Sequence, residues 1–176
     1  MANLHIRDAR PSDQDAIREL TLAAYQQYAA HMPPELWEGY RQGILSALAD
    51  SKPVDRIIAE QNGTLVGCVL LYPAGTVFSK TNGESVTLPY PEMRLLAVSP
   101  TVRGQGIGAA LVHECLRRAR VAGAKVMTLH TTDLMTVAMA MYERMGFVRA
   151  PETDFHPSPG FTVKGYRLSL DDPAQR

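Results

Sequence analysis

Cysteine is scarce in this chain of 176 residues, which contains only Cys68 and Cys115. Cys68 lies in a strand-like apolar run and Cys115 on the apolar stripe of an expected helix, so buried free thiols fit better than a disulfide or a metal site. Free, reduced cysteines are typical of reducing compartments. We therefore expect a cytoplasmic protein without a metal centre.

Long apolar runs are also missing. The longest, Gly67–Tyr72, is far shorter than the roughly 20 residues that cross a bilayer as a helix. The N-terminal stretch MANLHIRDAR lacks the basic start, apolar middle and small-residue cleavage site of a secretory signal. These two absences predict a protein that is neither exported nor bound to membranes.

The chain has no excess of charge of either sign, because 18 Lys and Arg residues balance 18 Asp and Glu residues. A protein that coats nucleic acid is normally strongly basic, so a nucleic-acid partner is disfavoured and a small or neutral partner is favoured. Apolar residues make up 45% of the chain, which is enough for one sizeable core, whereas two halves would each be marginal. We expect one domain that covers residues 1–176.

Hydrophobic spacing predicts two helices in the first third of the chain. The first is expected to begin at Ser12 as its N-cap, with Asp15 as the capping-box acid, and to run to about Ala30. A pair of prolines at 33–34 separates it from a second helix that ends near Asp50.

Strands are expected on both sides of Asn62-Gly63, a dipeptide typical of a tight hairpin turn. The later expected elements are, in chain order, a strand from Glu92, a helix that ends at Gly123, a strand over 125–131, a helix with Asp133 as its N-cap and Gly146 at its C-terminal end, and two final strands. This order fits a mixed sheet with helices on both faces. Residues 73–91 hold several turn formers around positions 81–83 and no apolar periodicity, so we expect a long functional loop there, a candidate lid.

The most informative stretch joins the strand that ends at Val98 to the following helix. It contains Pro100 and then the glycine-rich turn Arg103-Gly104-Gln105-Gly106-Ile107-Gly108. Such a turn at a helix N-terminus presents unpaired backbone N–H groups and the positive end of the helix dipole, which predicts a phosphate or pyrophosphate ligand. No Gly-Lys-Ser/Thr follows, and the spacing is not that of the dinucleotide fingerprint, so ATP and NAD are disfavoured.

In its context, this turn resembles the acyl-CoA pyrophosphate loop of the GNAT N-acetyltransferases, Arg/Gln-x-x-Gly-x-Gly/Ala. The resemblance begins at Glu92 and extends to Ala138-Met139-Ala140-Met141-Tyr142-Glu143-Arg144-Met145-Gly146-Phe147. This last segment is similar to the Ala-x-x-x-Tyr-x-x-x-Gly-Phe segment of the family. The resemblance implies the GNAT acyl-CoA N-acyltransferase fold, an α/β fold with a mixed central sheet and helices on both faces.

The resemblance also implies acetyl-CoA, the acetyl thioester of coenzyme A, as the cofactor. The residues implied to hold its pyrophosphate are Arg103, Gly104, Gln105, Gly106, Ile107 and Gly108. Glycine suits this loop because a Cβ would obstruct close approach of the ligand to the backbone. The residues implied to pair with the pantetheine arm, and to polarise the acetyl carbonyl through backbone N–H groups, are Leu96, Ala97 and Val98.

Two catalytic residues follow from the same resemblance. Glu92 is implied as the base, acting directly or through water, because a lysine-like amine with a pKa of about 10 is mostly protonated at neutral pH. His130, near the end of the next strand, is the alternative base, since its ordinary pKa is about 6.5. Tyr142 is implied as the general acid that protonates the leaving thiolate. Met135 stands where many relatives have an asparagine, which removes one polar contact to the cofactor.

These residues predict an N-acetyltransferase that transfers the acetyl group of acetyl-CoA to a primary amine by direct attack in a ternary complex. Neutral charge and an aromatic helical segment favour a small-molecule amine, with a peptide N-terminus or a protein lysine as the alternative. A non-catalytic acyl-CoA sensor or regulatory domain is the alternative of a different class, and a homodimer is a family-level expectation. The side chains considered for the acceptor pocket are Tyr25, Tyr28, His31, Trp37, Tyr40, Tyr72 and His156.

Overall fold

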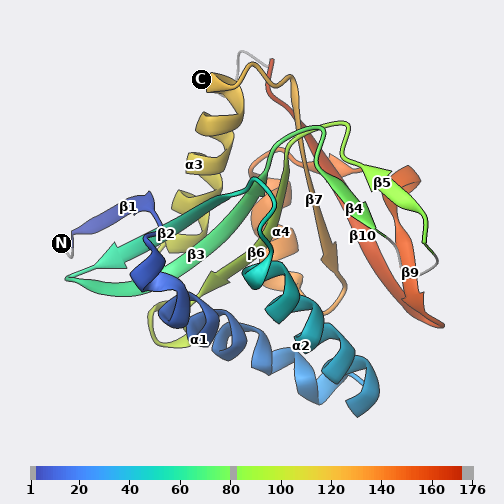
Figure 1. Cartoon of the computed structure of the whole chain (residues 1–176), viewed down its shortest axis with the longest axis horizontal. Helices are drawn as coiled ribbons and strands as arrows, with labels where there is room; N and C mark the ends of the chain where they lie inside the picture. The colour runs from blue at the N-terminus through green and yellow to red at the C-terminus, as the bar shows by residue number, and fades with distance from the viewer. Residues whose placement is uncertain (1–2, 80–82, 172–176) are drawn as a thin grey trace. The chain divides into compact units, whose positions relative to one another are not determined.

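The computed structural model describes residues 3–79 and 83–171 of the chain. The chain divides into two compact units, the first formed by Met1–Leu70 with Leu95–Glu114 and the second by Leu71–Arg94 with Cys115–Arg176. Three elements continue from one unit into the other: β3 (Thr64–Tyr72), β6 (Glu92–Val98) and α3 (Ile107–Val121) (Figure 1).

The sheet of the first unit has the strand order β1-β2-β3-β6. β1 (Leu4–Asp8) runs antiparallel to β2 (Asp55–Gln61). The hairpin between β2 and β3 turns at Asn62 and Gly63, whose φ angles of 52° and 77° lie in the left-handed region that this turn requires. The predicted hairpin is therefore confirmed. Its core side chains include Ile57, Ile58, Ala59, Val69 and Leu70.

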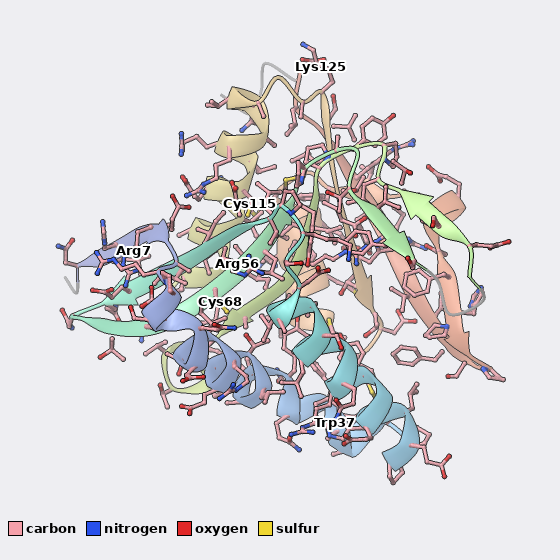
Figure 2. The ribbon with its side chains drawn as sticks, in the orientation of Figure 1. Arg7, Trp37, Arg56, Cys68, Cys115 and Lys125 are labelled. Carbon is pink, nitrogen blue, oxygen red and sulfur yellow. The ribbon has the colours of Figure 1, made fainter. Side chains whose placement is uncertain are left out.

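The helical part of the first unit contains η1 (Pro11–Asp13), α1 (Gln14–Tyr25), η2 (Gln26–His31) and α2 (Pro34–Ala49). The predicted helix start is wrong, because Ser12 lies inside the 3-10 turn η1 and Asp13 is the N-cap of α1. The Asp13 carboxylate accepts a hydrogen bond from the Arg10 N–H at 2.7 Å and one from Arg7 Nη1 at 2.7 Å. Arg7 lies on β1 (Figure 2) and also pairs with Glu60 of β2, so the capping residue is fixed by the sheet.

Both cysteines are buried, as predicted, and within the part of the chain that the structure describes neither is joined in a disulfide. Cys68 Sγ lies 3.3 Å from the Thr21 hydroxyl of α1, and burial raises the pKa of the Cys68 thiol to about 11. A thiol with such a pKa stays protonated and packs as a small apolar group. In the described part of the chain, none of the helices combines the length and the apolarity needed to span a bilayer.

The sheet of the second unit has the order β6-β7-β10-β8, and β9 pairs with β10. Its strands are the first part of β6, β7 (Val126–Thr132), β8 (Val148–Arg149), β9 (Phe155–Ser158) and β10 (Phe161–Ser169). β6 is parallel to β7, with Glu92 opposite Thr128, whereas β10 is antiparallel to β7, with Gly165 opposite His130. A mostly antiparallel central sheet combined with helices confirms the predicted α/β class.

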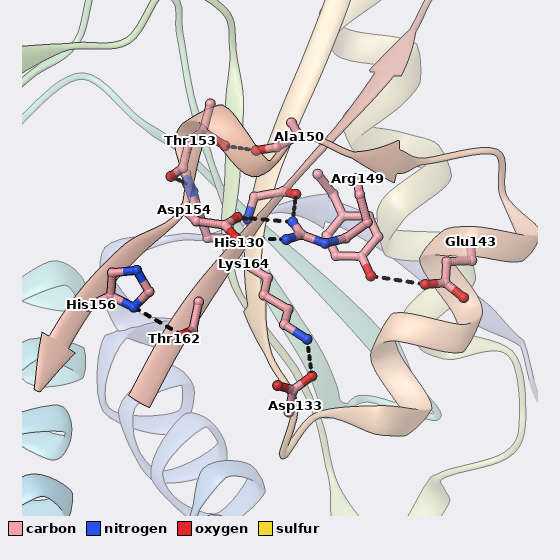
Figure 3. A network of polar contacts seen from close by, with 12 residues as sticks. His130, Asp133, Glu143, Arg149, Ala150, Thr153, Asp154, His156, Thr162 and Lys164 are labelled. Carbon is pink, nitrogen blue, oxygen red and sulfur yellow. Dashed lines mark hydrogen bonds and ion pairs between the residues drawn. The ribbon is translucent and has the colours of Figure 1, made fainter. Parts of the chain in front are cut away.

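Helix α4 (Thr136–Arg144) begins after Met135, not after Asp133, so the predicted N-cap is wrong. Asp133 lies in the preceding turn, where its carboxylate forms an ion pair with Lys164 of β10 (Figure 3). This pairing holds the acid on the sheet instead of at the first turn of the helix. At the other end of α4, Gly146 adopts a φ of 90°, which confirms the predicted left-handed C-terminal residue.

The expected long loop over residues 73–91 contains regular structure. β4 (Val77–Ser79) and β5 (Ser85–Thr87) form an antiparallel two-stranded ribbon, with Phe78 opposite Val86. Each strand is too short to give an alternating sequence pattern, which explains why the ribbon was not predicted. In the predicted turn at positions 81–83, residues 81 and 82 lie outside the described residues, and Gly83 has a φ of 83°.

Candidate functional site

The glycine-rich turn connects β6 to α3 in the first unit. After Val98 the chain forms η3 (Pro100–Val102) and then the turn that opens α3 at Ile107. Gly104 and Gly106 each have a φ of 79°, and apart from their chain neighbours no atom of the described residues lies within 4 Å of the position that a Cβ would take at either residue. The turn is therefore open on the side where side chains would project. Such an exposed backbone at the start of a helix of 15 residues fits a pyrophosphate group.

Gly67 of β3 brings the first turns of α3 close to the sheet of the first unit. A Cβ on Gly67 would lie 2.9 Å from Leu111 Cδ1, 3.0 Å from Ile107 Cγ2 and 3.2 Å from the Ala97 carbonyl oxygen. A larger residue would therefore require the Leu111 side chain to shift, and Ile107 and the Ala97 carbonyl to give way by a few tenths of an ångström. Sequence reasoning missed this role, although a glycine inside a strand is a recognised sign of close approach.

Arg103 is anchored by the helical part of the first unit. Its Nη2 donates to the Ala24 carbonyl oxygen at 2.9 Å, and its Nη1 donates to Gln27 Oε1 at 3.1 Å. Nearby, the Tyr25 hydroxyl donates to the Leu96 carbonyl oxygen at 3.3 Å. The sequence predicted that Arg103 faces a phosphate. In the structure its guanidinium fastens the turn to the end of α1, so the phosphate role stays a prediction.

Leu95 has an unusual backbone for a strand residue. Its φ is 52°, in the left-handed region that leucine rarely adopts. The parallel register between β6 and β7 covers Glu92 and Met93, just before this residue. The left-handed residue therefore stands between the paired start of β6 and Leu96, Ala97 and Val98, the residues predicted to offer backbone N–H groups to the cofactor.

Glu92 is buried, with only 3% of its surface exposed, although it carries a charge. Its Oε1 accepts from Arg94 Nε at 2.5 Å, and its Oε2 lies 3.4 Å from His130 Nδ1 and 3.5 Å from the Thr128 hydroxyl. Burial raises the pKa of the Glu92 carboxyl, but the His130 hydrogen bond and the Arg94 charge outweigh this effect and lower the pKa overall. The carboxyl group is therefore ionised at neutral pH.

His130, which is half-buried, pairs with buried Glu92. Its Nε2 lies 3.0 Å from the Thr153 carbonyl oxygen, which can only accept, so Nε2 carries a proton. Nδ1 faces the Glu92 carboxylate and gains a hydrogen bond only when it is protonated as well. Burial lowers the pKa of His130, but the hydrogen bond to Glu92 and the Glu92 charge raise it by more, so the pKa lies above its usual 6.5. The two bases that the sequence left as alternatives are thus in direct contact.

The turn that supplies the Thr153 carbonyl is fixed to β10 (Figure 3). A Cβ on Gly165 would lie 1.7 Å from Thr153 Oγ1, so only glycine fits opposite this turn. Asp154 Oδ1 accepts from the Gly165 N–H at 2.8 Å, and Asp154 Oδ2 pairs with Arg149 Nη2 at 2.7 Å. These contacts fix the position of the Thr153 carbonyl, and this carbonyl orients the Nε2 side of the His130 ring. The sequence did not predict these contacts.

Tyr142 lies on α4, with 5% of its surface exposed. Its ring makes an edge contact with Phe147, with the ring centroids 5.8 Å apart. Met135, at the N-cap of the same helix, is also buried. A buried, neutral tyrosine hydroxyl can donate a proton, so the geometry is compatible with the predicted acid and leaves that role a prediction.

The side chains considered for an acceptor pocket separate into groups. Tyr25, Tyr28, Trp37 and Tyr40 form a chain of ring contacts in the first unit, with centroids 5.9 to 6.3 Å apart. In the second unit, Tyr72 packs on Phe78, and His156 Nδ1 lies 3.0 Å from the Thr162 hydroxyl. In residues 3–79 and 83–171, no three His, Cys, Asp or Glu side chains are grouped in a way that could hold a metal ion.

Comparisons with known proteins agree with one another. The family model described as the acetyltransferase (GNAT) family matches residues 15–147. An IAA acetyltransferase of Azospirillum brasilense is 30% identical over 127 residues, which are 71% of this chain and 76% of that protein. The N-acetyltransferase YhfO of Bacillus subtilis is 30% identical over 152 residues, 82% of this chain and 89% of that protein. A solved GNAT family acetyltransferase of Brucella melitensis in complex with acetyl-CoA superposes with a TM-score of 0.60 at 26% identity, over 98% of this chain and 91% of that one.

Proposed function

This chain belongs to the GNAT acetyltransferase family, and we propose that it acetylates the primary amine of a small molecule by direct attack in a ternary complex. The coarser activity, acetyl-CoA-dependent N-acetyl transfer, follows from the family. The observation that carries the proposal is the contact of buried Glu92 with His130, because transfer to an amine needs a group that accepts a proton.

The pair accepts the proton as a unit. Glu92 alone is a weak base, since Arg94, Thr128 and His130 all donate toward its two oxygens. When His130 is neutral, its Nδ1 lone pair faces a carboxylate, an arrangement that favours uptake of a proton at Nδ1. The raised pKa of His130 expresses this preference. We assign the Glu92 carboxylate as the group that takes the amine proton, directly or through water, and Nδ1, which faces that carboxylate, as the atom on which the proton comes to rest.

Acetyl-CoA supplies the acetyl thioester when it is bound. Gly104 and Gly106 leave the backbone of the turn open for its pyrophosphate, with Arg103, Gln105, Ile107 and Gly108 completing the turn. Leu96, Ala97 and Val98 are proposed to direct backbone N–H groups at the pantetheine arm and at the carbonyl oxygen, which gains negative charge during transfer. Tyr142 is proposed to give its hydroxyl proton to the departing thiolate. One proton is thus accepted from the amine and one is donated to sulfur.

Location, assembly and domain organisation remain proposals. A cytoplasmic location is supported by the two buried free thiols. That the chain acts as a single acetyltransferase domain is supported by the family match, which runs through parts of both units. A homodimer is the family-level expectation and is checked by light scattering during gel filtration.

The proposal is tested by thiol release from acetyl-CoA over a panel of small amines, peptides and proteins. Thermal melting with acetyl-CoA, ATP or NAD is measured in parallel. We expect acetyl-CoA alone to raise the melting temperature, and thiol release to require a small amine, with one acetylated amine per thiol. Stabilisation without release on any acceptor would favour the non-catalytic sensor, and release only with peptides or proteins would contradict the small-molecule assignment. The absence of any shift at saturating acetyl-CoA would contradict the family-level activity.

A further inference from the structure

Arg94 projects from β6 beside the proton-accepting pair and is fixed on two sides. Its Nε donates to Glu92 Oε1 at 2.5 Å. The centre of its guanidinium lies 3.9 Å from the Phe78 ring centroid and 5.6 Å from that of Tyr72. Cation–π contact holds the plane of the group, and the Nε bond fixes its rotation within that plane. The guanidinium is therefore preorganised in a single orientation.

The edge of the Arg94 guanidinium that carries Nη1 and Nη2 is available to bind a ligand. Within residues 3–79 and 83–171, Nη1 and Nη2 of Arg94 have no hydrogen-bond partner. The Arg94 side chain is 35% exposed, whereas that of Glu92 is 4% exposed. The two terminal nitrogens form a planar fork that matches the two oxygens of a carboxylate. A fork that is held in place and left open is suited to recognising such a group.

The charges around Arg94 favour a carboxylate over a more highly charged anion. The positive charge of Arg94 and the negative charge of Glu92 cancel, and protonated His130 adds one positive charge. The cluster therefore carries one net positive charge when His130 is protonated and none when it is neutral. A single carboxylate neutralises the cluster once His130 has taken the amine proton, whereas a phosphate dianion would leave excess negative charge beside the Glu92 carboxylate in both protonation states.

We propose that Arg94 binds a carboxylate of the acceptor, so that the acceptor is a small amine that also carries a carboxylate, such as an amino acid. The inference rests on the proposed function, because it places the acceptor at the pair that takes its proton. The Glu92 carboxylate contacts both Arg94 and His130. The anion-binding guanidinium and the imidazole are therefore separated by a single carboxylate group. In this proposal a compact amino acid places its carboxylate on Arg94 and its amine toward the Glu92–His130 pair.

The test compares L-amino acids with their matching amides, which keep the amine and lose the negative charge. Wild type, Arg94→Gln and Arg94→Lys are assayed by thiol release, and Arg144→Gln on the exposed end of α4 serves as the matched control. In Arg94→Gln we expect the KM for the amino acid to rise about tenfold or more, the range of a lost charged hydrogen bond, while the KM for the amide changes less than twofold. Arg94→Lys keeps the charge without the fork and should fall between wild type and Arg94→Gln. Arg144→Gln should match wild type.

Loss of the Glu92 contact in these variants changes kcat for acid and amide alike, so the KM difference between the two substrates isolates the carboxylate contact. Equal KM values for acid and amide in wild type, or an equal rise for both in Arg94→Gln, would overturn the inference. Melting shifts with amino acid plus coenzyme A separate it from the proposed function. A shift in wild type that Arg94→Gln loses, without any turnover, would support the carboxylate contact and contradict the transferase. Neither turnover nor shift with any amino acid, while another small amine is acetylated, would overturn the carboxylate inference alone. Absence of turnover with every small amine would contradict the proposed function as well.

Discussion

At the scale of single residues, the central feature is a carboxylate that cannot act alone. Glu92 is buried, is held by Arg94 and Thr128, and has a lowered pKa, all of which make it a poor base by itself. His130 changes this, because a neutral imidazole facing a fixed carboxylate gains stability by taking a proton. The alternatives that the sequence offered, Glu92 or His130, are better described as the two halves of one acceptor.

Tyr142 is the residue for which a conservative substitution is most informative. Tyr142→Phe removes the hydroxyl and keeps the ring contact with Phe147, so the fold should be preserved. If the hydroxyl donates a proton to the leaving thiolate, kcat should fall by about 10² to 10⁴, the usual range for a general acid, with little change in the KM for acetyl-CoA. Steady-state thiol release measures both constants, and full turnover in Tyr142→Phe would remove Tyr142 from the mechanism.

At the scale of elements, the site depends on how closely α3 approaches β3 in the first unit. Gly67 permits this approach, since a Cβ there would meet Leu111, Ile107 and the Ala97 carbonyl at 2.9 to 3.2 Å. The glycine-rich turn lies directly before Ile107, so a displacement of α3 would also displace the turn. Packing inside the sheet is thereby linked to binding of the cofactor.

Gly67→Ala tests this link. Overpacking at this contact should lower the free energy of unfolding by about 1 to 3 kcal/mol, measured by urea denaturation. It should also reduce the melting shift produced by acetyl-CoA, because the turn moves with α3. Gly39→Ala on α2 is the matched control, since apart from the neighbouring backbone of its own helix no atom of the described residues lies within 4 Å of the new Cβ, and it should be neutral or stabilising by up to about 1 kcal/mol. A Gly67→Ala protein as stable as wild type, with an unchanged shift, would contradict this account of the packing.

At the scale of the whole molecule, local signals in the sequence predicted the α/β class, the β2–β3 hairpin and the glycine-rich turn, because each depends on neighbouring residues. The contact between Glu92 and His130 could not be predicted in this way. It depends on the parallel register that places Glu92 opposite Thr128, and α3 lies between these two strands in the sequence. No turn geometry fixes the register of strands joined through a helix. The contacts of Arg149, Asp154 and Gly165 behind His130 likewise form only once β10 is in place.

The ribbon of β4 and β5 contributes to the site only once the chain is folded. Phe78 of this ribbon covers the Arg94 guanidinium, whereas the sequence suggested only a long loop in this region. Three-residue strands carry too little periodicity to be recognised, and the ring contact depends on tertiary packing. The residues that distinguish this site from a generic acyl-CoA site are therefore those that only the folded chain brings together.

The most direct test of the central claim is the pH dependence of kcat at saturating acetyl-CoA and amine, in wild type and Glu92→Gln. Burial lowers the pKa of His130, whereas Glu92 and the Thr153 carbonyl raise it, and Arg94 lowers it. Asp154 also faces His130, since the His130 charge contributes to its lowered pKa. Because the neutral form of His130 accepts the proton, kcat should rise with pH through a limb centred above pH 6.5 in wild type. Glu92→Gln removes the strongest of the groups that raise this pKa and leaves the Thr153 carbonyl, so the limb should move to lower pH and the plateau should fall. An unchanged limb and plateau in Glu92→Gln would contradict the assignment of the pair as the proton acceptor.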